Sequence, residues 1–465
     1  MACYLGKEIQ RCFVQKGAGG MLKLVGYNLL LPIIFILYCP SFVIKLIRRG
    51  NVSRRFFERF GWYSRGQKEL LRSLRQPVWV HAVSVGEVVA ATTFIQRWRT
   101  RDPDLDFVLS ASTTTGHATA AGKLPPEVPL IYCPLDFPWS VARVLRLLNP
   151  RLLVLFELEV WPNLVTLADR RAVPVALVNG RLSDKSARGY YRNRWFFRSL
   201  FARLSVICTQ SQRDCQRFEQ IVGSDVPLHV CSTMKFDQVP EQTESSFGSS
   251  DFQNLFGIDA PVLWAAASTH AGEEELVARS FQNLKKEHPE LKLILVPRHH
   301  ERTDEVEAVL RRNGLTYRLR KPKGSAESSA GDEYADVLLV NTTGELQQFL
   351  AACDIVFMGK SLAGNSGGHN IIEPALLGKP VIHGPRMDNF QLVTELFRES
   401  EAAYEVERDE DLEKAVHALV ESPEMRTRLG RKARAVVDEN RGAVDRTIDL
   451  LQPLIQQPND DASEK

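Results

Sequence analysis

A glutamate stands at the end of an apolar segment, close to the start of a predicted helix. Residues 81–87, HAVSVGE, predict a strand that delivers Ser84, Gly86 and Glu87 to the start of a helix. Open α/β sheets bind their ligands at that edge. Gly86 lets a backbone approach closely, and the helix N-terminus stabilises an ionised Glu87. A carboxylate that only caps the helix has the same spacing, so a place in a ligand site and a capping role both remain open.

Two further carboxylates leave a second apolar strand. Glu157 and Glu159 belong to FELEVWPN, residues 156–163, and a carboxylate inside such a strand is costly unless it is paired or functional. Because residues two apart point to one side of a strand, we expect both to face the same cleft. One of them could orient a base or a substrate hydroxyl. Neither has metal-ligand partners, which argues against a dedicated metal site.

Two polar stretches in the same half suit a ligand. Residues 111–117, ASTTTGH, place Thr115 at a hydroxyl-rich strand end that could hold a polar group or cap a helix. A basic aromatic stretch, residues 181–195, begins at Arg181. It suits a phosphorylated lipid, and it is equally typical of a solvated helix face.

The second half of the chain repeats this logic with residues suited to a nucleotide. Ser268 and Thr269 end a strand at a helix start, where backbone N–H groups can hold a phosphate. Arg298 follows another strand and could clamp a phosphate or carboxylate, although surface decoration is the commoner role. The strongest pattern lies at 364–385, where Gly368 and Asn370 open a helix and Glu373 in its first turn suits the two hydroxyls of a ribose.

These residues need two α/β domains to position them. From Pro77 onward, short and nearly continuous apolar runs alternate with amphipathic stretches, which predicts parallel strands covered on both faces. A Glu/Ser/Gly-rich stretch then interrupts the pattern, and a second series begins. The expected parts are an anchor at 1–50, a Rossmann-like domain at 51–240, a linker at 241–255, a second Rossmann-like domain at 256–430, and a helix and tail at 431–465.

The N-terminal region predicts contact with a membrane. Residues 24–44 carry no charge and approach the length that spans a bilayer as a helix, although Pro32 and Pro40 also suit an interfacial hairpin. A basic cluster that includes Arg48 and Arg49 follows, which places the bulk of the chain on the cytoplasmic side and favours anionic lipids. We therefore expect a single N-terminal anchor.

Composition narrows the function further. The formal net charge of +3 is too small to indicate a nucleic-acid partner. The eight cysteines form no C-x-x-C pair and no Cys/His cluster at zinc spacing, so neither a disulfide framework nor a structural metal is expected.

Taken together, the motifs resemble those of the 3-deoxy-D-manno-oct-2-ulosonic acid (Kdo) transferases of lipopolysaccharide assembly, glycosyltransferase family 30. The resemblance runs from the membrane segment to about residue 450. The matching segments are HAVSVGE (81–87), STTTG (112–116), FELEVWPN (156–163), VNGRLSDKS (178–186), KFD (235–237), ASTHAGEE (267–274), PRH (297–299), TGE (343–345) and GGHNIIEPALLGKPVIHGP (367–385).

The resemblance implies a GT-B fold, in which two Rossmann-like domains face a cleft. It implies CMP-Kdo as donor, the lipid A precursor lipid IVA as acceptor, inversion at the transferred sugar, and no metal or other cofactor. The enzyme would act at the cytoplasmic face of the inner membrane. The implied roles are a catalytic base at Glu87 with Glu157 and Glu159 beside it, acceptor contacts from Ser84, Gly86, Thr115 and Arg181, and donor contacts from Ser268, Thr269, Arg298, His299, Gly344, Glu345, Gly368, Asn370 and Glu373.

The chain departs from the family pattern at a few positions. Ser232 and Thr233 replace the usual Gly-Asn, Asn341 stands where aspartate is common, and Arg386 replaces a common histidine. These changes leave the details of donor contact open.

Two other functions compete: a GT-B enzyme that uses a UDP-sugar on another lipid, and a dehydrogenase or noncatalytic nucleotide sensor. A dehydrogenase needs a G-x-G-x-x-G motif after its first strand, and this sequence has no such motif.

Overall fold

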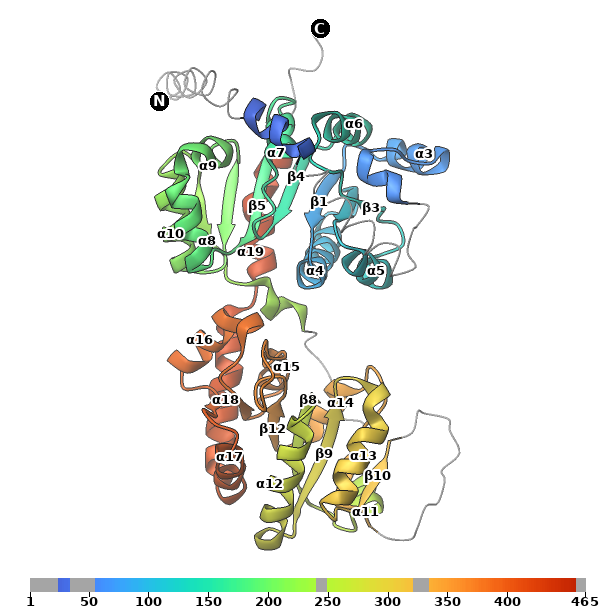
Figure 1. Ribbon diagram of the computed structural model, residues 1–465, viewed down its shortest axis with the longest axis vertical. Helices are drawn as coiled ribbons and strands as arrows, with labels where there is room; N and C mark the ends of the chain where they lie inside the picture. Colours follow the sequence, from blue (N-terminus) through green and yellow to red (C-terminus); the bar gives the residue numbers. More distant parts are fainter. Residues whose placement is uncertain (1–23, 34–54, 240–248, 321–333, 457–465) are drawn as a thin grey trace. The chain divides into compact units, whose positions relative to one another are not determined.

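A computed structural model of the chain describes residues 24–33, 55–239, 249–320 and 334–456 (Figure 1). The chain divides into two compact units. Unit 1 comprises residues 1–238 together with 442–465, and unit 2 comprises residues 239–441. The expectation of two doubly wound α/β halves is confirmed, because each unit is built on a parallel sheet of seven strands.

The sheet of unit 1 has the strand order β3-β2-β1-β4-β5-β6-β7. Chain order reverses at β1, which lies between β2 and β4, as in dinucleotide-binding folds. Most of its strands are buried along their whole length, which explains their continuous apolar sequences. The strands are β1 (Val78–Ala82), β2 (Phe107–Ala111), β3 (Leu130–Tyr132), β4 (Leu152–Phe156), β5 (Val175–Gly180), β6 (Val206–Thr209) and β7 (Leu228–Val230).

Helices cover both faces of this sheet. Alternate residues of β1 enter opposite cores: Val78 and Val80 pack in the core beneath α4 and α19, whereas Trp79 packs beneath α6, α7, α9 and α10 (Figure 1). The helices are η1 (Phe56–Phe60), α3 (Arg65–Ser73), α4 (Val85–Arg101), α5 (Thr114–Lys123), α6 (Pro138–Leu148), α7 (Pro162–Asp169), α8 (Asp184–Arg192), α9 (Arg194–Phe201), α10 (Gln212–Val222), η2 (Met234–Gln238) and α19 (Ala443–Gln456).

The sheet of unit 2 has the order β10-β11-β9-β8-β12-β13-β14, and its order reverses at β8. One face is covered by α12, α13 and α17. The strands are β8 (Val262–Thr269), β9 (Leu291–Pro297), β10 (Tyr317–Leu319), β11 (Val337–Leu339), β12 (Ile355–Met358), β13 (Val381–His383) and β14 (Tyr404–Glu405). The helices are α11 (Ser249–Phe256), α12 (Glu273–Glu287), η3 (His300–Arg302), α13 (Thr303–Arg312), α14 (Leu346–Ala352), α15 (Ile372–Leu376), η4 (Asp388–Phe390), α16 (Gln391–Glu399), α17 (Asp411–Glu421) and α18 (Pro423–Asn440).

Two of the expected boundaries differ from the elements observed. The stretch expected as a linker contains the start of α11, whose last residue, Phe256, is buried. Helix α18 runs through the expected boundary at 430/431 and stays in unit 2, whereas α19 packs in unit 1. The rest of the expected linker, residues 241–248, and the polar loop at 321–333 lie outside the described residues.

The predicted membrane segment is described only in part. Residues 24–33 form a helix, and residues 34–44, like the basic cluster up to Arg54, lie outside the described residues. Among the residues that the structure describes, no helix has the length and apolar character needed to cross a bilayer. The short helix is attached to unit 1, because the Tyr27 hydroxyl donates to Asp136 (3.0 Å) and the Asn28 amide donates to Asn163 (3.1 Å).

Candidate active site

Glu87 lies at the N-terminus of α4, directly after β1. Its side chain forms a capping box with Ser84: the Ser84 hydroxyl accepts from the Glu87 N–H (3.2 Å), and one Glu87 carboxylate oxygen accepts from the Ser84 N–H (3.2 Å). The other oxygen accepts from the Val83 N–H (3.0 Å). Glu87 is buried, whereas Ser84 and Gly86 are exposed. Glu87 is therefore a cap, and two acceptor positions of the four that a carboxylate offers remain for a further donor.

The neighbouring helix supports the turn that carries Glu87. The Thr113 hydroxyl donates to the Val83 carbonyl (2.8 Å) and accepts from the Gly116 N–H (3.0 Å). A side chain at Gly116 would come within 2.8 Å of that hydroxyl, so the glycine allows α5 to approach β1. Thr115, expected to contact the acceptor, is exposed in the first turn of α5.

The expected placement of Glu157 and Glu159 on a strand is wrong. Strand β4 ends at Phe156, and Glu157 adopts a left-handed backbone conformation (φ 54°) at the start of a turn. Period-two alternation therefore does not aim the two side chains. The turn nevertheless brings both carboxylates close enough to Glu87 for its charge to act on their pKa values. The Trp161 indole N–H donates to Glu159 (3.0 Å) and holds it.

These carboxyl groups are harder to ionise than exposed ones. Burial raises the pKa of Glu159 to about 7, and the negative charge of Glu87 adds to the effect. Burial also raises the pKa of Glu157, with a further contribution from Glu87, while Arg181 and Lys235 oppose the rise. Glu157 therefore lies near the carboxylates of Glu87 and Glu159 and near the cations of Arg181 and Lys235, at the edge of the unit 1 sheet where its strands end.

Lys235 is a site residue that sequence reasoning left without a role. It lies in η2, and burial lowers its pKa to about 8, with Arg181 adding to the effect and Glu157 opposing it. Arg181, which follows β5, is exposed as expected for a ligand contact. The KFD segment pointed to this position only as part of the resemblance, because nothing in the local spacing predicts that η2 reaches Glu157.

In unit 2, the loop after β12 is held by Glu273 at the start of α12. The Glu273 carboxylate is fully buried and accepts backbone N–H bonds from Lys360 (2.8 Å), Ser361 (2.9 Å), Leu362 (3.0 Å) and His270 (2.9 Å). This bracing fixes the loop after β12 against the loop after β8. Ser268, which has a left-handed backbone (φ 55°), and Thr269, which ends β8, are both buried there.

Histidines and cations gather at this edge of the second sheet. The Nε2 atoms of His270 and His369 are 3.0 Å apart, and the His299 ring meets the His270 ring edge to face. Burial lowers the pKa of His270 to about 4 and that of His369 to about 3, with added repulsion from Arg298 and Lys360. The imidazoles of His270 and His369 are therefore neutral near pH 7, and Arg298 and Lys360 supply the positive charge.

The glycine-rich segment supplies the expected carboxylate. Gly368 has a left-handed backbone (φ 66°), and a side chain there would come within 2.2 Å of the Met387 sulfur. Asn370 donates to Glu373 (3.1 Å), and the Ile372 N–H bonds to the Asn370 side chain (3.2 Å). Burial raises the pKa of Glu373, while Arg298 opposes the rise, so Glu373 belongs to the same group of side chains.

The expected contribution of the TGE segment is less direct. Gly344 is exposed with a left-handed backbone (φ 87°), and the Glu345 carboxylate accepts from Arg320 (3.0 Å) and from the Thr342 hydroxyl. Glu345 is therefore already paired. His270, His369 and Lys360 are site residues that our sequence-based choice omitted, although the first two stand in segments that carried the resemblance.

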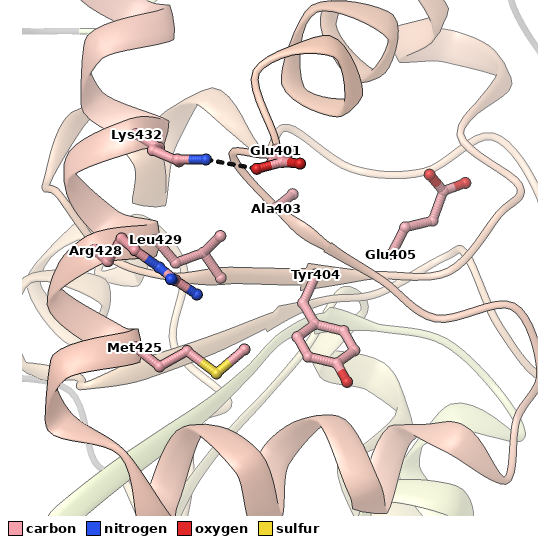
Figure 2. A pocket seen from close by; sticks show the side chains of 8 residues that line it. All are labelled: Glu401, Ala403, Tyr404, Glu405, Met425, Arg428, Leu429 and Lys432. Atoms are coloured by element: carbon pink, nitrogen blue, oxygen red, sulfur yellow. Dashed lines mark hydrogen bonds and ion pairs between the residues drawn. The ribbon is translucent and has the colours of Figure 1, made fainter.

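A separate pocket of about 370 Å³ lies between β14 and α18 in unit 2 (Figure 2). Lys432 donates to Glu401 across one side of it (2.8 Å). None of the expected site residues lines this pocket. The lining residues are Glu401, Ala403, Tyr404, Glu405, Met425, Arg428, Leu429 and Lys432.

Both candidate groups lie where chain order reverses in a parallel sheet. Glu87 and Glu157 follow β1 and β4 in unit 1. In unit 2, Ser268 lies at the end of β8 and Lys360 follows β12. Crevices outside the carboxyl ends of the strands at such points are where open α/β sheets bind ligands. The two groups thus occupy equivalent positions in their own units.

Comparison with solved structures defines the class of fold. HepE from Anabaena, solved in complex with UDP, superimposes with a TM-score of 0.53, covering 82% of this chain and 99% of that chain at 15% identity. This level of identity shows the fold alone. The chain has the GT-B-like architecture of two Rossmann-like units.

Sequence comparison then gives the family. Residues 54–238 match the family model described as 3-deoxy-D-manno-octulosonic-acid transferase (kdotransferase). The chain is 33% identical to the 3-deoxy-D-manno-octulosonic acid transferase of Haemophilus influenzae, covering 90% of this chain and 97% of that relative. It is also 33% identical to the Bordetella pertussis transferase of the same name, over 82% of this chain and 87% of the relative. The chain belongs to the Kdo transferase family, and it is a glycosyltransferase of lipopolysaccharide biosynthesis.

Proposed function

We propose that this enzyme transfers Kdo from CMP-Kdo to the lipid A precursor lipid IVA, with inversion and with Glu87 as the base. The observation that carries the proposal is the position of Glu87 in a chain of this family. Its carboxylate is fixed by two backbone N–H groups at the point where the unit 1 sheet reverses, beside Glu157, Arg181 and Lys235. A rigid, oriented carboxylate with free acceptor positions suits proton removal from a hydroxyl.

The reaction is a single displacement. The acceptor hydroxyl oxygen forms a bond to the anomeric carbon of Kdo while the bond from that carbon to the CMP phosphate oxygen breaks. The hydroxyl proton passes to Glu87, and the electron pair leaves with CMP. Arg181 and Lys235 offer positive charge to the phosphate or hydroxyl groups of the acceptor.

Unit 2 would hold the donor. Arg298 and Lys360 offer fixed positive charge to the CMP phosphate and the Kdo carboxylate. The neutral rings of His270 and His369 add hydrogen-bonding groups without adding charge. Glu373 accepts readily from the ribose hydroxyls, and Ser268 and Thr269 lie at the same strand edge. In this proposal protein cations stabilise the leaving phosphate, so the step needs no metal.

A membrane-facing surface on unit 1 fits a lipid acceptor. The helix at 24–33 is tied to the protein by Tyr27 and Asn28 and exposes Leu29 and Ile33 on one face. An aromatic cluster lies beside the same attachment point. It consists of Phe57, Phe60, Trp62, Phe137 and Trp139, with the Arg143 guanidinium over both tryptophans. Aromatic rings with basic groups suit the head-group region of a bilayer. We therefore propose anchoring at the cytoplasmic face of the inner membrane.

The test is the transfer reaction itself, run with a variant that separates catalysis from capping. Purified enzyme in detergent is incubated with CMP-Kdo and lipid IVA, and the mass of the lipid product is measured by mass spectrometry. We expect Kdo mass increments with the wild type and at least a ~100-fold slower reaction with Glu87→Gln, because general-base catalysis typically contributes that much.

Ser64→Ala is the matched control, because Ser64 and Gln67 form the same kind of capping box in α3, away from the site. Ser64→Ala weakens that cap by about 0.5–2 kcal/mol, whereas Glu87→Gln keeps a side chain that can fill the same place in the capping box. A loss of transfer in Glu87→Gln alone is therefore not a loss of capping. Near-normal turnover by Glu87→Gln would refute the base assignment. Transfer from a UDP-sugar in place of CMP-Kdo would refute the donor.

A further inference from the structure

Potential metal ligands meet in unit 2 where α12 and α17 end. The two helices run side by side (Figure 1), and their register is set one turn earlier, where Asn283 donates to Glu413 (3.0 Å). One turn further along each helix, Nε2 of His417 lies 3.4 Å from a Glu287 carboxylate oxygen. The ring of His288, the residue after α12, lies against the His417 ring with centroids 5.3 Å apart.

We propose that Glu287, His288 and His417 bind a divalent transition-metal ion of the Zn²⁺ type. One ligand atom from each of the three side chains lies within 4.8 Å of the others. Two metal–ligand bonds of about 2.1 Å at the tetrahedral angle separate their ligand atoms by about 3.4 Å. The His417–Glu287 separation already has this value, so only His288 needs to adjust. Two imidazoles and one carboxylate form a ligand set that suits zinc.

His288 supplies an independent observation that points to a ligand. The residue is 9% exposed, and its Nε2 atom, although a Glu421 carboxylate oxygen lies 3.4 Å away, makes no hydrogen bond within the part of the chain that the structure describes. A buried ring nitrogen without a hydrogen bond is costly. The other ring nitrogen, Nδ1, lies 3.5 Å from a carboxylate oxygen of Glu290. A carboxylate behind the second nitrogen is the usual support for a metal-bound histidine.

The local charge also favours a cation. Glu421 lies 3.4 Å from His288 Nε2 and, like Glu287, is the last residue of its helix. The negative ends of two helix dipoles therefore meet three carboxylates, those of Glu287, Glu290 and Glu421. Glu421 or water would complete the coordination. The site is distinct from the donor group, which forms after β8 and β12, whereas these residues follow α12 and end α17.

The experiment measures zinc binding by the full-length protein. The chain is purified in detergent, stripped with EDTA and titrated with ZnCl₂ by calorimetry, and its thermal unfolding is followed with and without zinc. We expect one zinc ion to bind and to raise the melting temperature. His417→Asn and Glu287→Gln should each weaken binding at least about tenfold, since loss of even an outer partner of a metal ligand costs that much. Both side chains are partly exposed, so neither substitution opens the core.

The controls locate the ion. His229→Asn removes an exposed histidine of unit 1 and should bind zinc like the wild type. Kdo transfer by His417→Asn should also be unchanged, which keeps this inference separate from the proposed reaction. If His417→Asn and Glu287→Gln both bound zinc as tightly as the wild type, the proposal would be overturned. The cluster would then be only a set of histidines paired with carboxylates. Loss of zinc binding in His270→Asn alone would overturn it too, since the ion would then lie in the donor group.

Discussion

At the scale of single residues, the carboxylates of unit 1 differ in their hydrogen bonds and in their surroundings. Glu87 is held by backbone N–H groups, whereas Glu159 is held by one indole N–H and lies in a buried, negatively charged surrounding. A group that loses hydration beside another carboxylate retains its proton to a higher pH. Glu159 is therefore poised to change charge near neutrality, next to the candidate base.

This environment predicts a pH-dependent effect of Glu159→Gln. With a pKa of about 7, Glu159 is mostly neutral at pH 6, and the amide mimics that form. At pH 8 the native residue is ionised, and its negative charge favours the arrival of the acceptor proton in the site, which the amide cannot do. We expect transfer rates equal to those of the wild type at pH 6 and several-fold lower at pH 8. A rate ratio that does not change with pH would contradict this role.

At the scale of elements, the loops of unit 2 are positioned by a buried carboxylate rather than by their own sequence. Glu273 joins the start of α12 to the loops after β8 and β12 through four backbone N–H bonds. The small residues of these loops permit the contact: a side chain at Gly359 would come within 2.6 Å of the Ser268 carbonyl. The donor group therefore depends on one brace.

Removing the brace should unfold the edge of unit 2. Glu273→Ala leaves four N–H groups without their acceptor, and each buried unsatisfied group costs about 1–3 kcal/mol. We expect the free energy of unfolding to fall by at least about 3 kcal/mol, measured by urea denaturation. Glu275→Ala is the control, because Glu275 is partly exposed and pairs with the exposed Arg312. Its loss should cost less than about 1 kcal/mol.

The aromatic cluster of unit 1 makes a second prediction at this scale. Trp62 and Trp139 are half-exposed; Trp62 follows η1, Trp139 lies in α6, and the Arg143 guanidinium contacts both rings. Replacing both tryptophans with alanine should weaken binding to anionic phospholipid vesicles several-fold in co-sedimentation, because each ring contributes apolar area at the interface. Tyr334→Ala, which removes an exposed aromatic ring of unit 2, should leave binding unchanged.

At the scale of the whole molecule, the two units are not two consecutive halves of the chain. Helix α19 belongs to unit 1, and its Val444, Ile448 and Leu451 pack in the core beneath α4. Asp237 fixes the return of the chain by accepting from the N–H groups of Gly442 (2.7 Å) and Val444 (2.8 Å). Unit 1 is therefore incomplete without the last helix.

Truncation should separate the stabilities of the units. A chain that ends at residue 441 loses three buried aliphatic side chains, each contributing about 1.5–3 kcal/mol. That sum is a large fraction of the 5–15 kcal/mol typical of a domain. Hydrogen exchange should show unit 1 losing protection while unit 2 keeps it. A chain that ends at residue 456 retains α19 and should match the wild type in both units. Equal protection of unit 1 in the two chains would contradict the assignment of α19 to its core.

The class of fold and the segments of the site could be predicted from the order of the amino acids. Strands buried on both faces must be apolar along their length, so runs such as 152–156 and 291–297 are visible without coordinates. Residues with special backbone requirements, such as Gly368, are also local signals. These constraints act over a few residues, and the motifs built on them identified the family.

Which side chains meet could not be predicted in this way, because it depends on how distant segments pack. Lys235 reaches Glu157 because η2 lies beside the edge of the unit 1 sheet, His270 meets His369 because β8 and β12 are neighbours, and the order of strands is not written in local spacing. His288 and His417 do not form a short zinc-binding motif, because they are far apart in the sequence. They come together only because α12 packs on α17. The turn at Glu157 likewise replaced the expected strand geometry. Side-chain contacts between distant segments depend on packing, whereas apolar periodicity and glycine requirements depend on the local backbone.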